Sequence, residues 1–191
     1  MNFQPVDRLP VWEWAMWWEK TVICWHGEGL PRELKHSQVF EIAQYLGLDP
    51  YQQFSFSTTQ ATIEATQHHT EGMVSNLLTI VDTDGDVTML VPWLQAVGVD
   101  GVLPLERQAG EDGVRLRELY PELPMIGHYN KLVMHKGEAA IRAEFERLVP
   151  LMKTGGFIPS VDHQTPPGVS LEEYRMSICI LKEYMTGAVQ E

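Results

Sequence analysis

From residue 77 onward, short apolar runs alternate with longer segments whose apolar residues recur at helical spacing. The runs are "LLTIV", "VDGVLPLE", "LPMIGHYN" and "GFIPSVDH", and their length and β-prone composition predict strands. Their centres lie near residues 80, 103, 126 and 158. This spacing is typical of βα units, whose helical crossovers make consecutive strands parallel. The pattern therefore predicts an α/β fold built on a parallel sheet.

The segments between and after these runs predict helices. "TMLVPWLQAVG" has helical spacing, and "GEDGVRLRELYP" ends at Pro121, which stops a helix. "SLEEYRMSICILKEYM" begins at Ser170 with Glu173 three residues on, the pattern of a capping box. The clearest helix is "KGEAAIRAEFERLVPLMKTGG", because its apolar residues share one face. These apolar residues are Ile141, Phe145, Leu148 and Val149.

The first 76 residues have a different texture. "RLPVWEWAMW" predicts a further strand that runs into a helix, with Glu13 at its end, and "SQVFEIAQYLGLDP" predicts a helix that stops at Gly47. Residues 51–76 are polar and show no clear period, so no structure is predicted for them. His68 and His69, within that stretch, are interpreted as surface-loop residues. The aromatic cluster predicts core or interface positions for Trp12, Trp14, Trp17, Trp18 and Trp25.

Polar residues stand at or just after the end of every predicted strand from residue 77 onward. In parallel βα architecture, all carboxyl ends of the strands lie on one edge of the sheet, and residues just past them converge there. We call this edge the rim. The rim residues predicted from the sequence are Asp82, Asp84, Glu106, His128, Asn130, Asp162 and His163.

Each group of rim residues has a functional and a structural interpretation. "DTDGD" at residues 82–86 is either a hard-metal or proton-transfer site, or a solvated turn that caps a helix. Asp162 and His163 are either metal ligands, an acid that orients a basic imidazole, or a capped turn before two prolines. Glu106 ends a very apolar run and therefore needs a partner if it is buried. His128 is either an acid–base residue or a structural histidine.

Composition narrows the classes of partner and compartment. The formal net charge of −12 argues against nucleic acid or an anionic membrane as partner. No apolar run approaches the ~20 residues of a membrane span. The two cysteines, Cys24 and Cys179, are far apart and flanked by apolar residues, which predicts reduced core thiols in a cytoplasmic protein. Walker, dinucleotide-binding and GxSxG motifs do not occur in the sequence.

Three stretches resemble a known family in order and spacing. "VDTDGDVTMLVPWLQAVGVDGVLPLE", "MIGHYNKLVMHKGEAAI" and "GGFIPSVDHQTPPGVSLEEY" are similar to the C-terminal half of the uroporphyrinogen decarboxylase-like superfamily, in the branch near the cobalamin-dependent methyltransferases. "RLPVWEWAMWWEKT", "EGLP" and "YLGLDP" resemble the start of that branch. The resemblance implies one domain over residues 1–191, with an N-terminal strand and helix part in 1–50 and C-terminal βα units in 77–191.

The resemblance also implies a fold and a chemistry. Family members are (β/α)8 TIM barrels with the site at the rim, and they act on tetrapyrroles or transfer methyl groups between a corrinoid and a thiol or similar acceptor. The methyltransferases hold zinc with a His-x-Cys-Gly motif and a later Cys near a Thr-Pro. Here Asp82 and Asp84 stand at the first two ligand positions, and Asp162 or His163 stands at the third. Such ligands favour a harder divalent metal, or zinc with oxygen and nitrogen ligands.

Two departures from the family shape the prediction. The decarboxylases' arginine-rich stretch is replaced by "EWAMWWEKT", which disfavours porphyrinogen decarboxylation. A (β/α)8 barrel needs ~250 residues, whereas this chain has 191, so the prediction is a shortened or partial barrel. An open half-barrel would expose edge strands and its apolar interior. We therefore expect two chains to pair as a homodimer.

The leading functional hypothesis is metal-assisted methyl transfer that involves a corrinoid as substrate or cofactor. The metal ligands would be Asp82, Asp84 and either Asp162 or His163, while Glu106 and His128 would serve in acid–base chemistry or substrate contact. The expected partners are a small-molecule substrate or corrinoid and a corrinoid protein. The alternatives are a non-catalytic protein that binds a corrinoid, tetrapyrrole or metal, a decarboxylase of a tetrapyrrole-like substrate, and a structural remnant without a ligand.

Overall fold

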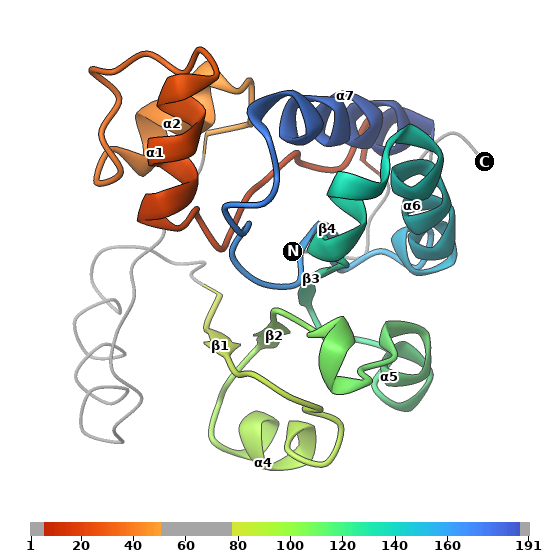
Figure 1. Ribbon diagram of the computed structural model, residues 1–191. Helices are drawn as coiled ribbons and strands as arrows, with labels where there is room; N and C mark the ends of the chain where they lie inside the picture. The colour runs from red at the N-terminus through yellow and green to blue at the C-terminus, as the bar shows by residue number, and fades with distance from the viewer. Residues whose placement is uncertain (1–5, 51–77, 188–191) are drawn as a thin grey trace.

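Four parallel strands form the sheet at the centre of the molecule. A computed structural model describes residues 6–50 and 78–187; the unassigned stretch 51–76, with His68 and His69, lies outside these residues. The strands pair in the order β1-β2-β3-β4 (Figure 1). They are β1 (Ile80–Asp82), β2 (Gly101–Leu103), β3 (Met125–Tyr129) and β4 (Phe157–Val161). The predicted parallel βα units are therefore confirmed, and neighbours in the sheet are consecutive in the chain, as they are in a (β/α)8 barrel.

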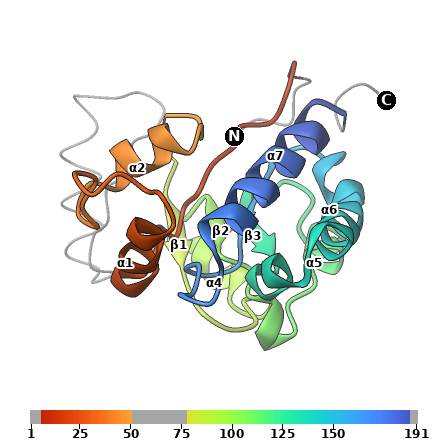
Figure 2. The same ribbon diagram turned by 45° about the horizontal axis from the view of Figure 1, so that its top comes forward.

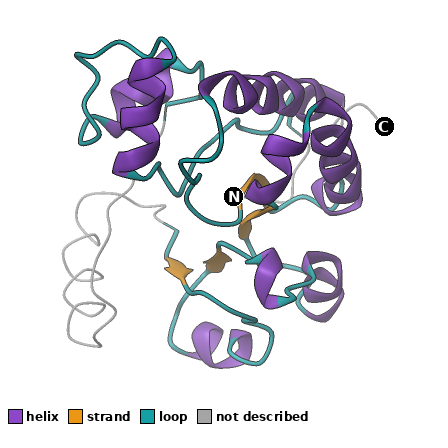
Figure 3. Cartoon of the chain, viewed as in Figure 1, coloured by secondary structure: helices purple, strands orange, loops and turns teal. Residues whose placement is uncertain are grey.

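Helices follow the strands where the apolar spacing predicted them. After β1 and β2 come α4 (Val91–Ala96) and α5 (Gly113–Leu119), and after β3 and β4 come α6 (Glu138–Met152) and α7 (Leu171–Gly187) (Figure 3). The N-terminal part contributes α1 (Glu19–Gly27) and α2 (Val39–Tyr45). The ends of β2 and β3 are followed by two short 3₁₀ turns, η1 (Arg107–Ala109) and η2 (Lys131–Lys136). In the part of the chain described, no helix has the length and apolar character needed to cross a membrane.

Side-chain caps explain where two of these helices begin. The carboxylate of Asp112 accepts hydrogen bonds from the amides of Val114 and Arg115 at the start of α5. At α7, the Ser170 hydroxyl accepts from the amide of Glu173, and the Glu173 carboxylate accepts from the amide of Ser170. Such reciprocal bonds satisfy backbone donors that a helix leaves unpaired. The predicted capping box is confirmed.

The main core consists of buried residues from the sheet, the N-terminal part and the helices, and Figure 2 shows α6 and α7 side by side. Within the main core, Trp17 and Trp25 are fully buried and pack against Tyr174 of α7, with ring centroids 4.9–6.0 Å apart. The core prediction is therefore confirmed for these two tryptophans, whereas Trp18 is exposed. Cys24 and Cys179 are free but lie on the surface. The prediction of core thiols is wrong because both cysteines face away from the packed sides of α1 and α7.

The N-terminal segment, residues 9–17, runs beside β4. Its side chains alternate between buried and partly exposed from Val11 to Trp17, which is the period of an extended chain. Backbone pairing, however, is limited to one bridge between Trp17 and Thr165. The Ser160 hydroxyl makes a further connection, because it donates to the carbonyl of Trp12 and accepts from the amide of Trp14. The predicted strand is thus extended but is held partly by a side chain.

Trp12 and Trp14 cover apolar residues of the sheet that lie outside the main core. They pack against Leu103, Ile126 and Ile158, which are buried in a small cluster of their own. The expectation that an open half-barrel exposes its apolar interior is therefore wrong for these three residues. The N-terminal segment supplies the side chains that shield them.

Candidate functional site

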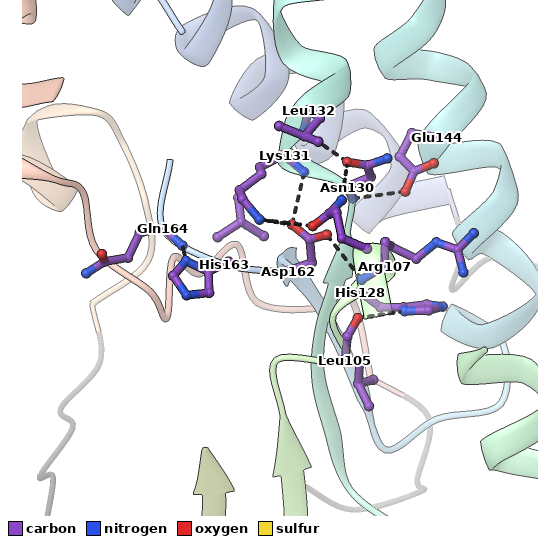
Figure 4. A network of polar contacts seen from close by, with 12 residues as sticks. Leu105, Arg107, His128, Asn130, Lys131, Leu132, Glu144, Asp162, His163 and Gln164 are labelled. Atoms are coloured by element: carbon purple, nitrogen blue, oxygen red, sulfur yellow. Dashed lines mark hydrogen bonds and ion pairs between the residues drawn. The ribbon is translucent and has the colours of Figure 1, made fainter. Parts of the chain in front are cut away.

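Asp162 is the centre of the polar network at the rim. Its side chain is fully buried, and its carboxylate accepts hydrogen bonds from the amide of Arg107 at 3.3 Å, the amide of Lys131 at 3.2 Å and the ammonium of Lys131 at 3.2 Å. Figure 4 shows the carboxylate between these two residues. Because Arg107 follows β2 and Lys131 follows β3, Asp162 ties three strand ends together. The rim predicted from the sequence therefore exists in this part of the sheet.

Neighbouring side chains hold the Lys131 ammonium and the turn around it. The ammonium also donates to the side-chain oxygen of Gln108 at 3.1 Å, and the Gln108 amide donates to the side chain of Asn130 at 3.0 Å. The backbone amide of Asn130 donates to the carboxylate of Glu144 in α6. Asn130 also caps η2 by accepting from the amide of Leu132. The predicted rim residue Asn130 thus has a structural role as a cap.

His163 diverges from Asp162 although the two are adjacent in sequence. Figure 4 shows its ring apart from the Asp162 cluster and beside Gln164. The amide of Gln164 donates to Nδ1 of His163 at 2.8 Å. A nitrogen that accepts a hydrogen bond carries no proton, so this contact assigns the proton of the neutral ring to Nε2. Nε2 is therefore a donor at the rim.

Asp82 and Asp84, at the end of β1, lie near His163 at the end of β4. Partial desolvation raises the pKa of the Asp82 carboxyl group, and the negative charge of Asp84 raises it further, whereas the positive charge of His163 in its protonated form lowers it. Such an effect comes from a charge in the vicinity of the carboxyl group. β1 and β4 are the first and last strands of the sheet, so this electrostatic influence links residues from opposite ends of the strand order. A carboxyl group with a raised pKa is a better proton acceptor than an ordinary one.

Asp82, Asp84, Asp162 and His163 do not form a ready set of metal ligands in the part of the chain that the structure describes. Across residues 6–50 and 78–187, no three side chains among His, Cys, Asp and Glu are placed to hold a metal ion together. The Asp162 carboxylate already accepts hydrogen bonds from the Lys131 ammonium and from the amide of Arg107. A histidine ligand binds metal through a nitrogen lone pair, and at His163 the lone pair on Nδ1 accepts from Gln164. The metal site predicted at Asp82, Asp84, Asp162 and His163 stays a prediction.

His128 does not point toward the rim. Gly127 and His128 both have positive φ, 113° and 67°, and this turns the ring toward the helical layer. The ring accepts a hydrogen bond from the amide of Gly113 in α5 at Nε2, and its Nδ1 lies 3.0 Å from the carbonyl of Leu105. Burial lowers the pKa of His128 to about 4, so the ring is neutral and acts structurally. Glu106, in contrast, is partly exposed at the rim, as predicted.

Sequence reasoning missed the parts played by Lys131 and Glu13. Lys131 directly follows the rim residue Asn130, which was its only signal. Glu13 stands at the end of the predicted first strand but is buried on the helix side, where its carboxyl group accepts from the hydroxyl of Tyr174 at 2.8 Å. Burial raises the pKa of Glu13 to about 8, and the nearby charge of Asp162 acts in the same direction.

Comparison with known proteins gives no family assignment. No protein-family model matches the chain, and no curated protein matches its sequence.

Proposed function

We propose that the chain is an enzyme of the uroporphyrinogen decarboxylase-like type, built as a shortened (β/α)8 barrel, that moves a proton at the rim during methyl transfer involving a corrinoid. The observation that supports this proposal is the raised pKa of the Asp82 carboxyl group at the end of β1, on which His163 after β4 exerts an electrostatic influence. This influence links a carboxyl group of raised pKa to an imidazole that presents Nε2–H. Acid–base catalysis needs such a pair within reach of one substrate.

The two residues take complementary roles. Asp82 accepts the proton that a thiol or another protic acceptor must lose before it attacks a methyl group, and Asp84 keeps Asp82 basic through its charge. His163 donates from Nε2 to the negative charge that develops on the acceptor. When bound, a methylated corrinoid supplies an electrophilic methyl group. In this proposal the corrinoid is a substrate that binds at the rim.

A decarboxylase is the second candidate, because its proton step would use the same pair in reverse. Loss of carbon dioxide leaves an electron pair on carbon, and the protonated form of Asp82 would deliver the proton to it. The raised pKa of Asp82 favours this role as much as the role of a base.

The test is an activity assay on the complete chain with both substrate classes. Methylcobalamin with a thiol acceptor would be followed by the absorbance of the demethylated corrinoid, and uroporphyrinogen would be followed by loss of carboxyl groups. We expect Asp82→Asn and His163→Gln each to lower kcat at least tenfold. The matched control is Asp100→Asn, because the Asp100 carboxylate accepts from the amide of Thr79 at the opposite edge of the sheet. Equal turnover in all four proteins would contradict the proposed roles.

Absence of turnover with either substrate class would favour the non-catalytic alternative. Equilibrium binding of cobalamin to the same proteins would then distinguish a binding protein from a chain without a corrinoid ligand. Elemental analysis of protein purified without a metal-affinity tag belongs in the same experiment. About one metal ion per chain would support the predicted metal site.

A further inference from the structure

A small cavity lies on the helix side of the sheet, beneath the ends of β3 and β4. Its volume is about 20 Å³, and its walls come from the N-terminal segment, β3, β4, η2, α6 and α7. One water molecule needs roughly 10–15 Å³ of such space and two to four polar partners. The walls are mostly apolar, but they include polar groups from Glu13, Tyr129, Ser160, Tyr174 and Ser177. The cavity therefore has the size and the chemistry of a site for one water.

Tyr129 supplies a hydroxyl group in need of a partner. The residue is 2% exposed, and its ring stacks on Phe145 of α6 with centroids 4.6 Å apart. Its hydroxyl group has no hydrogen-bond partner among the described residues. Burying a hydroxyl group without a partner is costly, and native proteins almost always satisfy such groups with protein or ordered water.

Glu13 supplies the second polar group, from the N-terminal segment. It is 3% exposed, and its two carboxyl oxygens accept from the Tyr174 hydroxyl at 2.8 Å and from the amide of Ala15 at 3.3 Å. Because burial raises its pKa to about 8, the group is a neutral acid at pH 7. A neutral carboxylic acid has an O–H donor as well as acceptor oxygens, so it can bind water in either direction.

We propose that this cavity binds one structural water molecule, held by the hydroxyl group of Tyr129 and the carboxyl group of Glu13. The water links β3 to the N-terminal segment, which also reaches the sheet through the Ser160 hydroxyl, the indole of Trp14 that donates to the carbonyl of Val161, and the bridge between Trp17 and Thr165. It thereby helps to hold Trp12 and Trp14 against Leu103, Ile126 and Ile158. This inference is independent of the proposed function.

The sign of the change in Tm that one substitution causes tests the proposal. If water bridges the two groups, Tyr129→Phe removes a bond that the water makes and lowers Tm by about 2–4 °C. If the hydroxyl is unsatisfied, the same change removes a buried orphan group and leaves Tm unchanged or higher. The control is Tyr120→Phe, because the Tyr120 hydroxyl donates to the carbonyl of Thr88 at 3.0 Å. The decrease in Tm of Tyr120→Phe shows how much stability is lost with an ordinary hydroxyl hydrogen bond.

A high-resolution crystal structure of the complete chain gives the second readout. We expect a water within hydrogen-bonding distance of both Tyr129 Oη and a carboxyl oxygen of Glu13, and we expect this water to be lost or displaced in Tyr129→Phe. A Tm that is unchanged or raised by Tyr129→Phe overturns the proposal. Well-ordered density without a water at this position overturns it as well, whatever the Tm.

Discussion

The ammonium of Lys131 lies 3.2 Å from the carboxylate of Asp162, and the carboxylate is fully buried while the lysine side chain is 13% exposed. The pair joins the turn after β3 to the end of β4. Two backbone amides, those of Arg107 and Lys131, complete the shell around the carboxylate. The fold positions these three donors around the buried carboxylate, and each donor would lose its acceptor if the carboxylate were removed.

Removal of the Asp162 carboxylate should therefore destabilise the chain strongly. Asp162→Ala leaves two amides and an ammonium without their acceptor, and we expect a loss of about 3 kcal/mol in the free energy of unfolding, measured by urea denaturation. Arg142→Ala is the control, because Arg142 pairs with Glu183 on the exposed surface. Exposed pairs contribute about 0–1 kcal/mol. Similar small losses in both variants would show that the rim network does not support the fold.

Glu13 should make stability fall as pH rises. Its pKa is about 8 in the folded chain against 4.5 for the free group, so between these values the folded chain binds one more proton than the unfolded chain. The contribution of Glu13 to the free energy of unfolding is full below pH 4.5. It is lost progressively up to about pH 8, by at most ~1.4 kcal/mol per pH unit.

The Glu13 effect is isolated by comparison with Glu13→Gln. We expect the free energy of unfolding of the wild type minus that of the variant to decrease between pH 5 and pH 8 and then to level off. Glu183→Gln, on the exposed surface, controls for the loss of a carboxyl group elsewhere. A difference between wild type and Glu13→Gln that does not change with pH would mean that Glu13 is not buried.

His128 should have the opposite pH dependence. Folding lowers its pKa from 6.5 to about 4, so between these values the unfolded chain binds the extra proton. Its contribution is present above pH 6.5 and is lost as pH falls toward 4. The advantage of the wild type over His128→Gln, measured by thermal unfolding, should shrink over this range. An advantage that is constant with pH would place the ring in contact with solvent.

Gly127 should tolerate no side chain. Its φ is 113°, and a Cβ atom there would lie 1.9 Å from the carbonyl oxygen of Pro104. We expect Gly127→Ala to cost more than about 3 kcal/mol or to prevent folding. Gly168→Ala is the control, because a Cβ atom at Gly168 meets no atom within 4 Å. Circular dichroism melting curves of the two purified variants would measure the difference.

Periodicity predicted the elements because each strand and helix of the βα units buries one face. The apolar residues of α6 and the capping box at Ser170 both behave as their spacing indicates. Of the two interpretations of His128, the contacts of its ring favour the structural one, because the positive φ of Gly127 and of His128 departs from the regular strand backbone. A glycine inside a predicted strand was the available signal for such a distortion.

The partners of the rim residues were harder to predict than their positions. Asp162 and His163 are adjacent in sequence, yet one faces Lys131 and the other faces Gln164. That divergence depends on η2, a short turn that places Lys131 over the strand ends, and no periodicity encodes such a turn. The burial of Glu13 similarly depends on the approach of α7, which is far away in the sequence.

The central claim is that the ends of β1 and β4 face each other, and the pKa of Asp82 measures this directly. Carboxyl carbon NMR would give that pKa in the wild type, in His163→Gln and in Asp84→Asn. Because the positive charge of protonated His163 lowers the pKa of Asp82 and the negative charge of Asp84 raises it, we predict a higher value in His163→Gln and a lower value in Asp84→Asn. An Asp82 pKa that does not respond to His163→Gln would show that the two strand ends are apart, and the proposed site would not exist.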